Sequence, residues 1–281
     1  MRKKRGESIN KKSINTELFS ESFTKESVYI LGILWADGHI RVNKSTKTVS
    51  INCVEKDMEE IKNVFMKTGD WIYGNPIKKY HKEKEVKTQR KLSTTTWNFY
   101  DLLYKYGYNS KESGEIKVLD LIPKDLIKYW FRGFLDGDGC IRLGNKYGIS
   151  VVFAGPLNQN WVFLHKICEN MSINYRIDKV TNKLGGYSHF IIHRKNDVKK
   201  ILDYIYGDYD FIGLSRKYEK YKKICDYIES KSKKFWSESD TNFLIVNYQK
   251  IGGVSCSKIL GKKLHSIYNK SKQLGLMKTQ L

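Results

Sequence analysis

The chain contains an internal repeat, which restricts its possible folds more than any other feature of the sequence. The segment Ile30-Leu-Gly-Ile-Leu-Trp-Ala-Asp-Gly38 is matched about one hundred residues later by Phe131-Arg-Gly-Phe-Leu-Asp-Gly-Asp-Gly139. Asp37 and Asp138 stand at corresponding places in the two motifs. Because self-similarity at a fixed distance indicates one structural unit built twice, we expect two similar units in one chain.

The same order of predicted elements follows each motif: strand, strand, helix, strand, strand, helix. In the first copy, strands are expected at residues 39–43, 48–54, 71–79 and 90–96, with one helix at 58–67 and another ending near 107. In the second copy, strands are expected at 140–143, 149–153, 173–180 and 187–193, with one helix at 161–170 and another ending near 207. A last helix is expected at 214–228. With the motif helices added, the pattern predicts an α+β fold of two αββαββα repeats.

Changes in composition divide the chain into four segments. We expect a basic N-terminal arm at residues 1–26, a first repeat at 27–126, a second repeat at 127–229 and a small C-terminal domain at 230–281. Pro123 lies just before the second repeat, and a polar, basic linker runs from Glu229 to Lys234.

Each motif has the spacing of a helix with one apolar stripe. The apolar residues and the final aspartate fall at i, i+3, i+4 and i+7, namely Ile30, Ile33, Leu34 and Asp37, then Phe131, Phe134, Leu135 and Asp138. Small residues four positions apart, Gly32 with Ala36 and Gly133 with Gly137, allow two helix backbones to approach closely. A glycine inside a helix costs about 1 kcal/mol relative to alanine, so close packing is the expected compensation. We predict that the two motif helices pack against each other.

Such packing would bring Asp37 and Asp138 together at one edge of the helix pair. Both end their helices, directly before Gly38 and Gly139, which we place in the usual helix-terminating position. The negative end of a helix dipole disfavours a carboxylate, and two adjacent carboxylates repel each other. A bound Mg²⁺ ion would remove both penalties, and two such ions can activate water and stabilise the leaving oxygen in phosphodiester hydrolysis. A single Asp-Gly pair after a helix is usually only a cap, so it is the doubling that points to chemistry.

The net charge indicates what kind of partner the chain binds, and the cysteines indicate the cellular compartment. The chain has 51 Lys and Arg against 30 Asp and Glu, a formal net charge of +21, so nucleic acid is the leading partner. No apolar run reaches the roughly 18–20 residues that span a membrane, and the start lacks a secretory signal. Five scattered cysteines give neither a disulfide framework nor a zinc finger. We expect a soluble, intracellular protein without a membrane partner.

The paired motifs resemble those of the LAGLIDADG homing endonucleases, in particular the single-chain members with two motifs. The resemblance extends over residues 27–229 and includes the stretch Ser215-Arg-Lys-Tyr218. It implies a pseudo-symmetric monomer with two antiparallel DNA-binding sheets, which cuts both strands of double-stranded DNA with two or more Mg²⁺ or Mn²⁺ ions. The last acidic residue of each motif, Asp37 or Asp138, would be catalytic and bind metal, assisted by the backbone carbonyls of Ala36 and Gly137.

The two halves differ at two places that matter for this comparison. The earlier acidic position of the motif holds Asp136 in the second copy but Trp35 in the first. Before the last helix of each repeat, we align Lys195 with Thr95. Similar proteins often have a basic side chain near here that steadies the scissile phosphate or a metal-bound water. The resemblance therefore makes Lys195 a further catalytic candidate, with a surface lysine at a helix start as the alternative.

Basic residues on and near the predicted strands are candidates for DNA contacts, because a strand that buries one face projects side chains from the other. In the two repeats these candidates are Arg41, Lys44, Lys78, Lys79, Arg90, Arg142, Lys146, Arg176, Lys179 and Arg194. Each is individually more often a solvated surface charge, so we expect no more than half of them to touch DNA.

The segment after residue 230 predicts three short helices. Trp236 is followed by a capping signal from Ser237 to Asp240, and Gly252-Gly253 ends the first helix. The third helix has an apolar face made of Leu264, Ile267, Tyr268, Ser271 and Leu274. Residues 236–276 resemble a Myb-like helix-turn-helix, whose third helix would enter the major groove. The DNA-binding candidates there are Lys262, Lys263, His265, Asn269, Lys270 and Gln273. A three-helix protein-interaction domain is the alternative.

Together these resemblances imply a site-specific, double-strand DNA endonuclease for intron homing, acting in a bacterial or phage-infected cell or in an organelle. Two alternatives stay open. One is a non-cleaving LAGLIDADG/helix-turn-helix transcriptional regulator, against which the presence of both Asp37 and Asp138 argues. The other is a maturase that binds its host intron RNA and needs neither carboxylate.

Overall fold

A computed structural model describes residues 13–78, 80–81, 84–85, 87–108, 116–144, 148–181, 185–207, 212–232 and 236–277, without the side chains of 80–81, 84–85 and 230–232. Two of the candidate DNA contacts, Lys79 and Lys146, lie outside the described residues, as do residues 1–12 of the expected basic arm. The rest of that arm, residues 13–26, packs with the first repeat, because Ile14 and Phe19 are buried and the first motif helix begins at Lys25. The chain divides into two compact units, residues 1–224 and residues 225–281, which are described separately.

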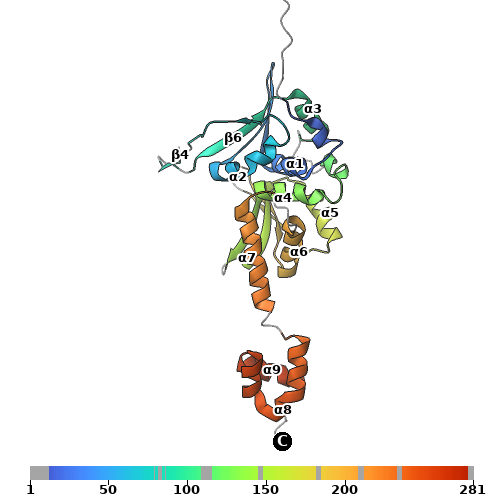
Figure 1. The fold of residues 1–281 in the computed structure, drawn as a ribbon, viewed down its shortest axis with the longest axis vertical. Helices are drawn as coiled ribbons and strands as arrows, with labels where there is room; N and C mark the ends of the chain where they lie inside the picture. Colours follow the sequence, from blue (N-terminus) through green and yellow to red (C-terminus); the bar gives the residue numbers. More distant parts are fainter. Residues whose placement is uncertain are drawn as a thin grey trace, which may run out of the picture. The chain divides into compact units, whose positions relative to one another are not determined.

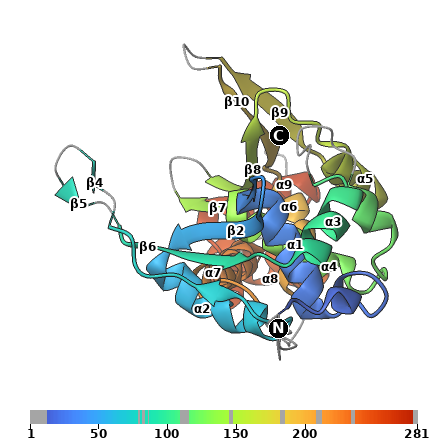
Figure 2. The ribbon, with the colours of Figure 1, turned by 90° about the horizontal axis from the view of Figure 1, so that it is seen from above.

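The first repeat follows the predicted order of elements. After a short 3-10 helix, η1 (Thr16–Phe19), its elements are α1 (Lys25–Asp37), β1 (Gly38–Val42), β2 (Lys47–Val54), α2 (Glu55–Met66), β3 (Ile72–Tyr73), β6 (Gln89–Thr94) and α3 (Trp97–Lys105). A small hairpin, β4 (Tyr80–His81) with β5 (Lys84–Glu85), extends away from the helices between β3 and β6 (Figure 2). The expected strand at 71–79 was wrong in continuity: regular pairing stops after β3, and beyond it Gly74 and Ile77 form isolated backbone hydrogen bonds with β6. Pro76 has no N–H to donate to a strand ladder, and Gly74 and Asn75 also disfavour strand.

The second repeat has the same series of elements. A 3-10 helix, η3 (Lys117–Asp120), leads to α4 (Ile127–Asp138), β7 (Gly139–Gly144), β8 (Gly148–Pro156), α5 (Val162–Asn170), β9 (Arg176–Val180), β10 (Tyr187–Ile192) and α6 (Lys195–Tyr206). α7 (Ser215–Ser232) then ends the first unit and begins the second.

Each repeat contains one antiparallel, four-stranded sheet. The strand orders are β1-β2-β6-β3 and β7-β8-β10-β9. The strands β1, β2, β3 and β6 therefore occupy the same places in their sheet as β7, β8, β9 and β10. The register also agrees, because Gly38 pairs with Ile51 and Gly139 with Phe153. The predicted α+β class with two similar antiparallel sheets is confirmed.

The motif helices α1 and α4 lie side by side at the centre of the first unit, between the two sheets (Figure 1). α1 is buried on nearly all sides, as expected for a helix that is apolar around most of its circumference. One sheet face of each repeat packs on helices: the Phe134 ring on α4 stacks on Phe153 of β8 at 5.5 Å between centroids. In the described part of the chain, no helix is both long and apolar enough to cross a membrane.

After the end of α7, the described part of the C-terminal unit contains α8 and α9, and α8 has an internal break. α8 (Glu238–Leu260) starts with the predicted capping box of Ser237 and Asp240, which is confirmed. Gly252 interrupts the helix with a left-handed φ of 76°, so the predicted break at Gly252-Gly253 is also confirmed. Leu244, Cys256 and Ile267 form the core between the two halves of α8 and α9 (Leu264–Gln273).

Candidate active site at the ends of the paired helices

The contact between α1 and α4 depends on glycine at one place in each motif. A Cβ atom on Gly32 would lie under 3.0 Å from the carbonyl oxygen of Trp130, and one on Gly133 under 3.0 Å from that of Tyr29. Real Cβ atoms essentially never approach backbone atoms so closely. The prediction that the small residues allow close backbone approach is therefore confirmed.

The same packing brings the ends of α1 and α4 together. Asp37 is the last residue of α1 and Asp138 the last of α4, and Asp37 is exposed. A Cβ on Gly137 would meet the Cβ of Ala36 and would lie 3.2 Å from Oδ2 of Asp37. The end of each motif therefore touches the end of the other, and both aspartates belong to one small region.

Tyr108 lies beside both carboxylates. It is buried at 4% exposure, and its hydroxyl is close enough to Gly38 that a Cβ there would collide with it. Burial, followed by the negative charges of Asp37 and Asp138, raises the pKa of Tyr108 well above its ordinary value. The hydroxyl therefore stays protonated and borders the region that holds the two carboxylates. Tyr108 was not a sequence candidate, because no motif marks it.

Gly38 and Gly139 stand at the helix-terminating positions as expected, but neither adopts the left-handed conformation common for a glycine there. Their φ angles are −68° and −94°, and each is the extended first residue of a strand. Glycine is needed there for space, because a Cβ would collide with the carbonyl oxygen of Leu34 at Gly38 and of Leu135 at Gly139. The chain therefore passes from each motif helix directly into the first strand of a sheet.

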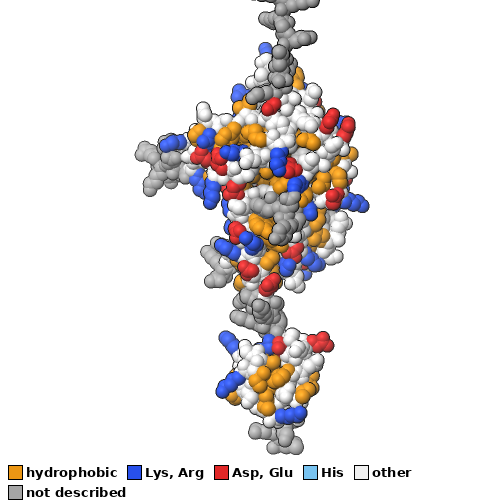
Figure 3. Space-filling model, viewed as in Figure 1, with side chains coloured by type: hydrophobic (Ala, Val, Ile, Leu, Met, Phe, Trp, Pro, Cys, Tyr) orange, Lys and Arg blue, Asp and Glu red, His pale blue; other side chains and the backbone are white. Residues whose placement is uncertain are grey.

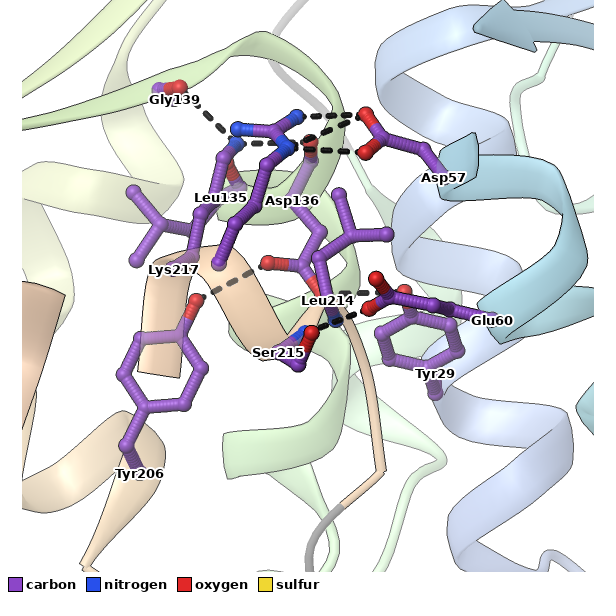
Figure 4. A network of polar contacts seen from close by, with 11 residues as sticks. Tyr29, Asp57, Glu60, Leu135, Asp136, Gly139, Tyr206, Leu214, Ser215 and Lys217 are labelled. Carbon is purple, nitrogen blue, oxygen red and sulfur yellow. Dashed lines mark hydrogen bonds and ion pairs between the residues drawn. The ribbon is translucent and has the colours of Figure 1, made fainter. Parts of the chain in front are cut away.

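Asp136 is a buried structural carboxylate. It accepts hydrogen bonds from the hydroxyls of Tyr29 (3.0 Å) and Tyr206 (2.9 Å) and from the backbone N–H of Leu214 (2.9 Å), as Figure 4 shows. Burial raises its pKa, and the nearby positive charge of Lys217 opposes this effect. In the first motif, Trp35 is buried instead and packs edge-on against Tyr108 at 5.5 Å. The earlier acidic position of the motif is therefore buried in both repeats. Asp136 fills it with hydrogen bonds in the second repeat, and Trp35 fills it with ring contacts in the first.

The start of α7 is bound to both repeats. Arg216 forms a bidentate ion pair with Asp57 on α2, with its shortest N–O distance at 2.7 Å, and the Ser215 N–H donates to Glu60 (Figure 4). Lys217 is 3% exposed and donates to backbone carbonyls at the end of α4. The resemblance had marked this stretch, but neither role was predicted.

The alignment of Lys195 with Thr95 was wrong by two residues. β6 ends at Thr94, which pairs with Val49, and β10 ends at Ile192, which pairs with Val151, the counterpart of Val49. The next helix begins three residues after each of these strand ends. Lys195 is therefore the counterpart of Trp97. It is exposed at the first position of α6.

The strand register sorts the basic candidates by sheet face. Arg41, Arg142 and Arg176 lie on the face opposite the helices, together with Lys91, which we call the outer face. Arg90 and Lys179 fall on the helix-facing side, and Arg90 is held there by Glu55 at 2.8 Å and the Gly74 carbonyl. The candidates Lys44, Lys78 and Arg194 are exposed outside the strands. On the visible face of the first unit, cationic and anionic side chains are intermixed (Figure 3).

In the C-terminal unit, α9 presents a mostly polar outer face. His265, Asn269 and Gln273 are exposed, Lys270 is partly exposed and Lys263 is the exposed N-cap. Lys262 is different: its side chain is 7% exposed, pairs with Asp240 at 2.9 Å and lies over the Trp236 ring. The predicted apolar face holds for Ile267, Ser271 and Leu274, whereas Leu264 and Tyr268 are exposed.

The donors at the helix ends suit a hard divalent cation. They are the carboxylates of Asp37 and Asp138 and the backbone carbonyls of Ala36 and Gly137, all of them oxygen atoms. Among the described residues, no group of three or more His, Cys, Asp or Glu side chains could hold a metal ion. Two protein carboxylates leave coordination positions for water and phosphate oxygens, which is how Mg²⁺ is usually bound.

Comparisons with known proteins give distant similarities. No family model matches the chain. A 179-residue stretch is 23% identical to the uncharacterized protein MJ0314 of Methanocaldococcus jannaschii, covering 62% of this chain and 65% of that protein's length.

Solved structures with a similar chain path include two LAGLIDADG homing endonucleases and one meganuclease. I-LtrWI, a LAGLIDADG homing endonuclease bound to target DNA, has a TM-score of 0.47 and 14% identity, over 80% of this chain and 97% of that one. I-GzeII in complex with its DNA target has a TM-score of 0.44 and 15% identity, over 73% and 91%. I-SmaMI, bound to uncleaved DNA with calcium ions, has a TM-score of 0.44 and 13% identity, over 73% and 92%. At these values, neither the sequence relative nor the solved structures assign a function to the chain.

Proposed function

We propose that the chain is a metal-dependent, site-specific DNA endonuclease of the homing type, which cuts both strands of a duplex. One observation carries the proposal: two matched helices place Asp37 and Asp138 together, at the point where each helix passes into a four-stranded antiparallel sheet. Because both the carboxylates and the sheets occur twice with the same topology, the arrangement suits two strands of one duplex.

The residues of the site have separate tasks under this proposal. Asp37 and Asp138 hold the divalent cations, with the carbonyls of Ala36 and Gly137 as further oxygen donors. When bound, such ions lower the pKa of water and stabilise the charge that develops on the leaving oxygen. The glycine-dependent contact between α1 and α4 fixes the spacing of the carboxylates, and the buried Tyr108 lies beside them.

The outer faces of the two sheets are the proposed DNA surface. Arg41 and Lys91 lie on the first outer face, and Arg142 and Arg176 on the second. Cations supply affinity through phosphates, and neighbouring polar side chains read base edges. Thr48 and Asn52 share the first face with the cations and are suited to such contacts, whereas Ser50 on the same face is buried.

We propose that the C-terminal unit is a second DNA reader, with α9 as its recognition helix. His265, Asn269 and Gln273 are the base-reading candidates because they are exposed on one side of α9. Lys262 is not among them, since its ammonium pairs with Asp240. Tethering two readers raises affinity through effective concentration. Because both motifs lie in one chain, a monomer would hold the whole proposed site.

Because the target sequence is not known, the test first selects a DNA duplex that the protein binds. A randomised duplex library is selected for binding in Ca²⁺, and the recovered duplex is then incubated with the protein in Mg²⁺, Mn²⁺ or EDTA. The proposal expects double-strand cleavage at one position with Mg²⁺ or Mn²⁺, and none in EDTA. Tight, specific binding without cleavage in any metal would support a transcriptional regulator instead, and preferential binding of structured RNA would support a maturase.

A further inference from the structure

We propose that α9 selects A·T base pairs by apolar contact: Leu264 and Tyr268 cover the C5 methyl groups of thymine in the major groove. This inference rests on the proposed role of the C-terminal unit as a second DNA reader, and it adds the kind of base pair that the unit selects. The predicted buried face of α9 included both residues, whereas the structure exposes them.

The exposed side of α9 consists of two neighbouring rows of side chains. Residues four apart lie one above the other on a helix, which gives a first row of Leu264, Tyr268 and Lys272. The second row is displaced by one residue and consists of His265, Asn269 and Gln273. The second row is the one proposed to read bases, so a groove that receives it also receives the first row.

The two apolar side chains of the first row are large and only partly covered by the protein. Leu264 is 37% exposed and Tyr268 is 39% exposed. A single apolar side chain on a surface is ordinary. Here two lie on successive turns of the proposed recognition helix, where contact with another apolar group would remove them from water.

The Tyr268 ring is held in place by α8. A Cβ on Gly253 would lie 2.7 Å from Cε1 of Tyr268, so the ring lies directly on this buried glycine. Tyr248 lies against the same position, with its Cε2 at 3.3 Å. The ring is therefore oriented before any partner binds, which reduces the entropy lost on binding.

The charge around the apolar pair favours DNA as the partner. Residues 241–281 contain seven lysines and no aspartate or glutamate. Lys263 stands directly before Leu264, and Lys272 lies one turn after Tyr268; both are exposed. A cation at each end of the pair is suited to the phosphates that border a groove.

Among the four bases, thymine fits this combination of side chains. Its C5 methyl is an apolar group on the major-groove edge, and its partner adenine offers N6 and N7 to an amide side chain. Asn269, which directly follows Tyr268, carries such an amide and is exposed. A G·C pair has no methyl group, so the two rows together favour A·T pairs.

The test removes single methyl groups from the DNA. Comparison of the full chain with a protein lacking residues 233–281 first locates the part of the selected duplex that the C-terminal unit protects. Each thymine of that part is then replaced by deoxyuridine, which lacks only the C5 methyl, and affinity for the full chain is measured in Ca²⁺. We expect a loss of roughly fourfold at each contacted thymine, the factor for withdrawing one such group from water.

Variants connect the effect to the two side chains. Leu264→Ala and Tyr268→Ala should each bind the thymine duplex more weakly and lose the deoxyuridine effect at the thymine that the residue contacts. Tyr268→Phe should keep the effect, because it retains the ring. Ile245→Ala is the control, since Ile245 is an exposed apolar residue on α8 and should leave the effect unchanged. The deoxyuridine series itself needs no variant, so it remains decisive if Tyr268→Ala does not fold.

The outcomes separate the inference from the proposed function. A footprint that the loss of residues 233–281 does not shorten would overturn the second reader, and the inference with it, without bearing on cleavage. A shortened footprint whose lost part has no A·T pairs, or in which deoxyuridine changes affinity less than twofold at every position, would overturn the inference alone. The same holds if folded Leu264→Ala and Tyr268→Ala proteins stay as sensitive to deoxyuridine as the wild type.

Discussion

Single glycines set the distance between the two motif helices. Gly32 and Gly133 face the carbonyl oxygens of Trp130 and Tyr29, where even a methyl group has no room. Since both glycines are helical, they are required for space and not for an unusual backbone conformation. The cost of a glycine within a helix is thus compensated by direct backbone packing, which brings Asp37 and Asp138 together.

Replacing Gly133 with alanine should force α1 and α4 apart. We expect a loss of about 1–3 kcal/mol or more in the free energy of unfolding, because backbone atoms cannot move aside as a flexible side chain would. The measurement is the denaturant midpoint of the purified protein. Gly144→Ala is the matched control, since a Cβ at Gly144 meets nothing within 4 Å. Equal stability of the two variants would show that the close approach has been misjudged.

At the residue scale, some of the site could be predicted from sequence and some could not. Asp37 and Asp138 were found because the motif is doubled, and a repeated pattern of apolar and small residues fixes their place on each helix. Tyr108 could not be found, because its position depends on where the chain returns after α3. Lys217 lay in a recognised stretch, but its role depends on a contact with carbonyls, which carry no sequence signal.

At the scale of elements, local patterns predicted most helices and strands, and register determined what they present. Alternation along a strand assigns side chains to two faces but does not say which face meets the helices. Only the pairing of β6 with β2 shows that Arg90 faces the helices and Lys91 does not. The same pairing corrects the alignment of Lys195, since a shift of one or two residues changes its counterpart.

The capping box of α8 makes the C-terminal unit sensitive to acid. The hydrogen bond from Lys262 has the largest effect on Asp240 and lowers its pKa. Burial opposes this effect, and the hydrogen bonds with Ser237 lower the pKa further. Because the folded-state pKa lies below that of the unfolded chain, the unfolded state binds more protons as the pH falls through about 4, and stability is lost there.

We therefore expect Asp240→Asn to destabilise this unit at neutral pH by about 0.3–1 kcal/mol, a typical value for an acidic residue at a helix N-terminus. The difference from the wild type should vanish below about pH 3. It can be measured by hydrogen exchange of α8 amides, corrected for the intrinsic effect of pH. Glu238→Gln, in the same helical turn, is the control. A difference that persists in acid would show that the carboxylate charge is not responsible.

At the scale of the molecule, the net charge of +21 is divided among different tasks. Arg90, Arg216 and Lys262 neutralise acidic partners and hold the fold together. Lys217 binds the end of a helix. The cations on the outer sheet faces are the ones available to DNA under the proposed function. Composition therefore indicated an anionic partner, and the strand register identified the candidate surface.

Removing residues 233–281 should weaken DNA binding and shorten the protected footprint from one end, because α7 remains whole while the second reader is lost. Footprinting on the selected duplex measures both effects. The triple variant His265→Ala, Asn269→Ala, Gln273→Ala in the full chain should reproduce the shortened footprint. An unchanged footprint in either protein would assign the C-terminal unit to protein contacts.

The most direct measurement of the central claim is single-turnover cleavage of the selected duplex by Asp37→Asn and Asp138→Asn, with affinity measured in parallel. Each variant keeps the size of the side chain and removes the charge that a divalent cation requires. We predict that either substitution abolishes double-strand cleavage in Mg²⁺ while DNA affinity in Ca²⁺ changes little. Double-strand cleavage at the wild-type rate by either variant would contradict the assignment of the paired aspartates as the metal-binding centre.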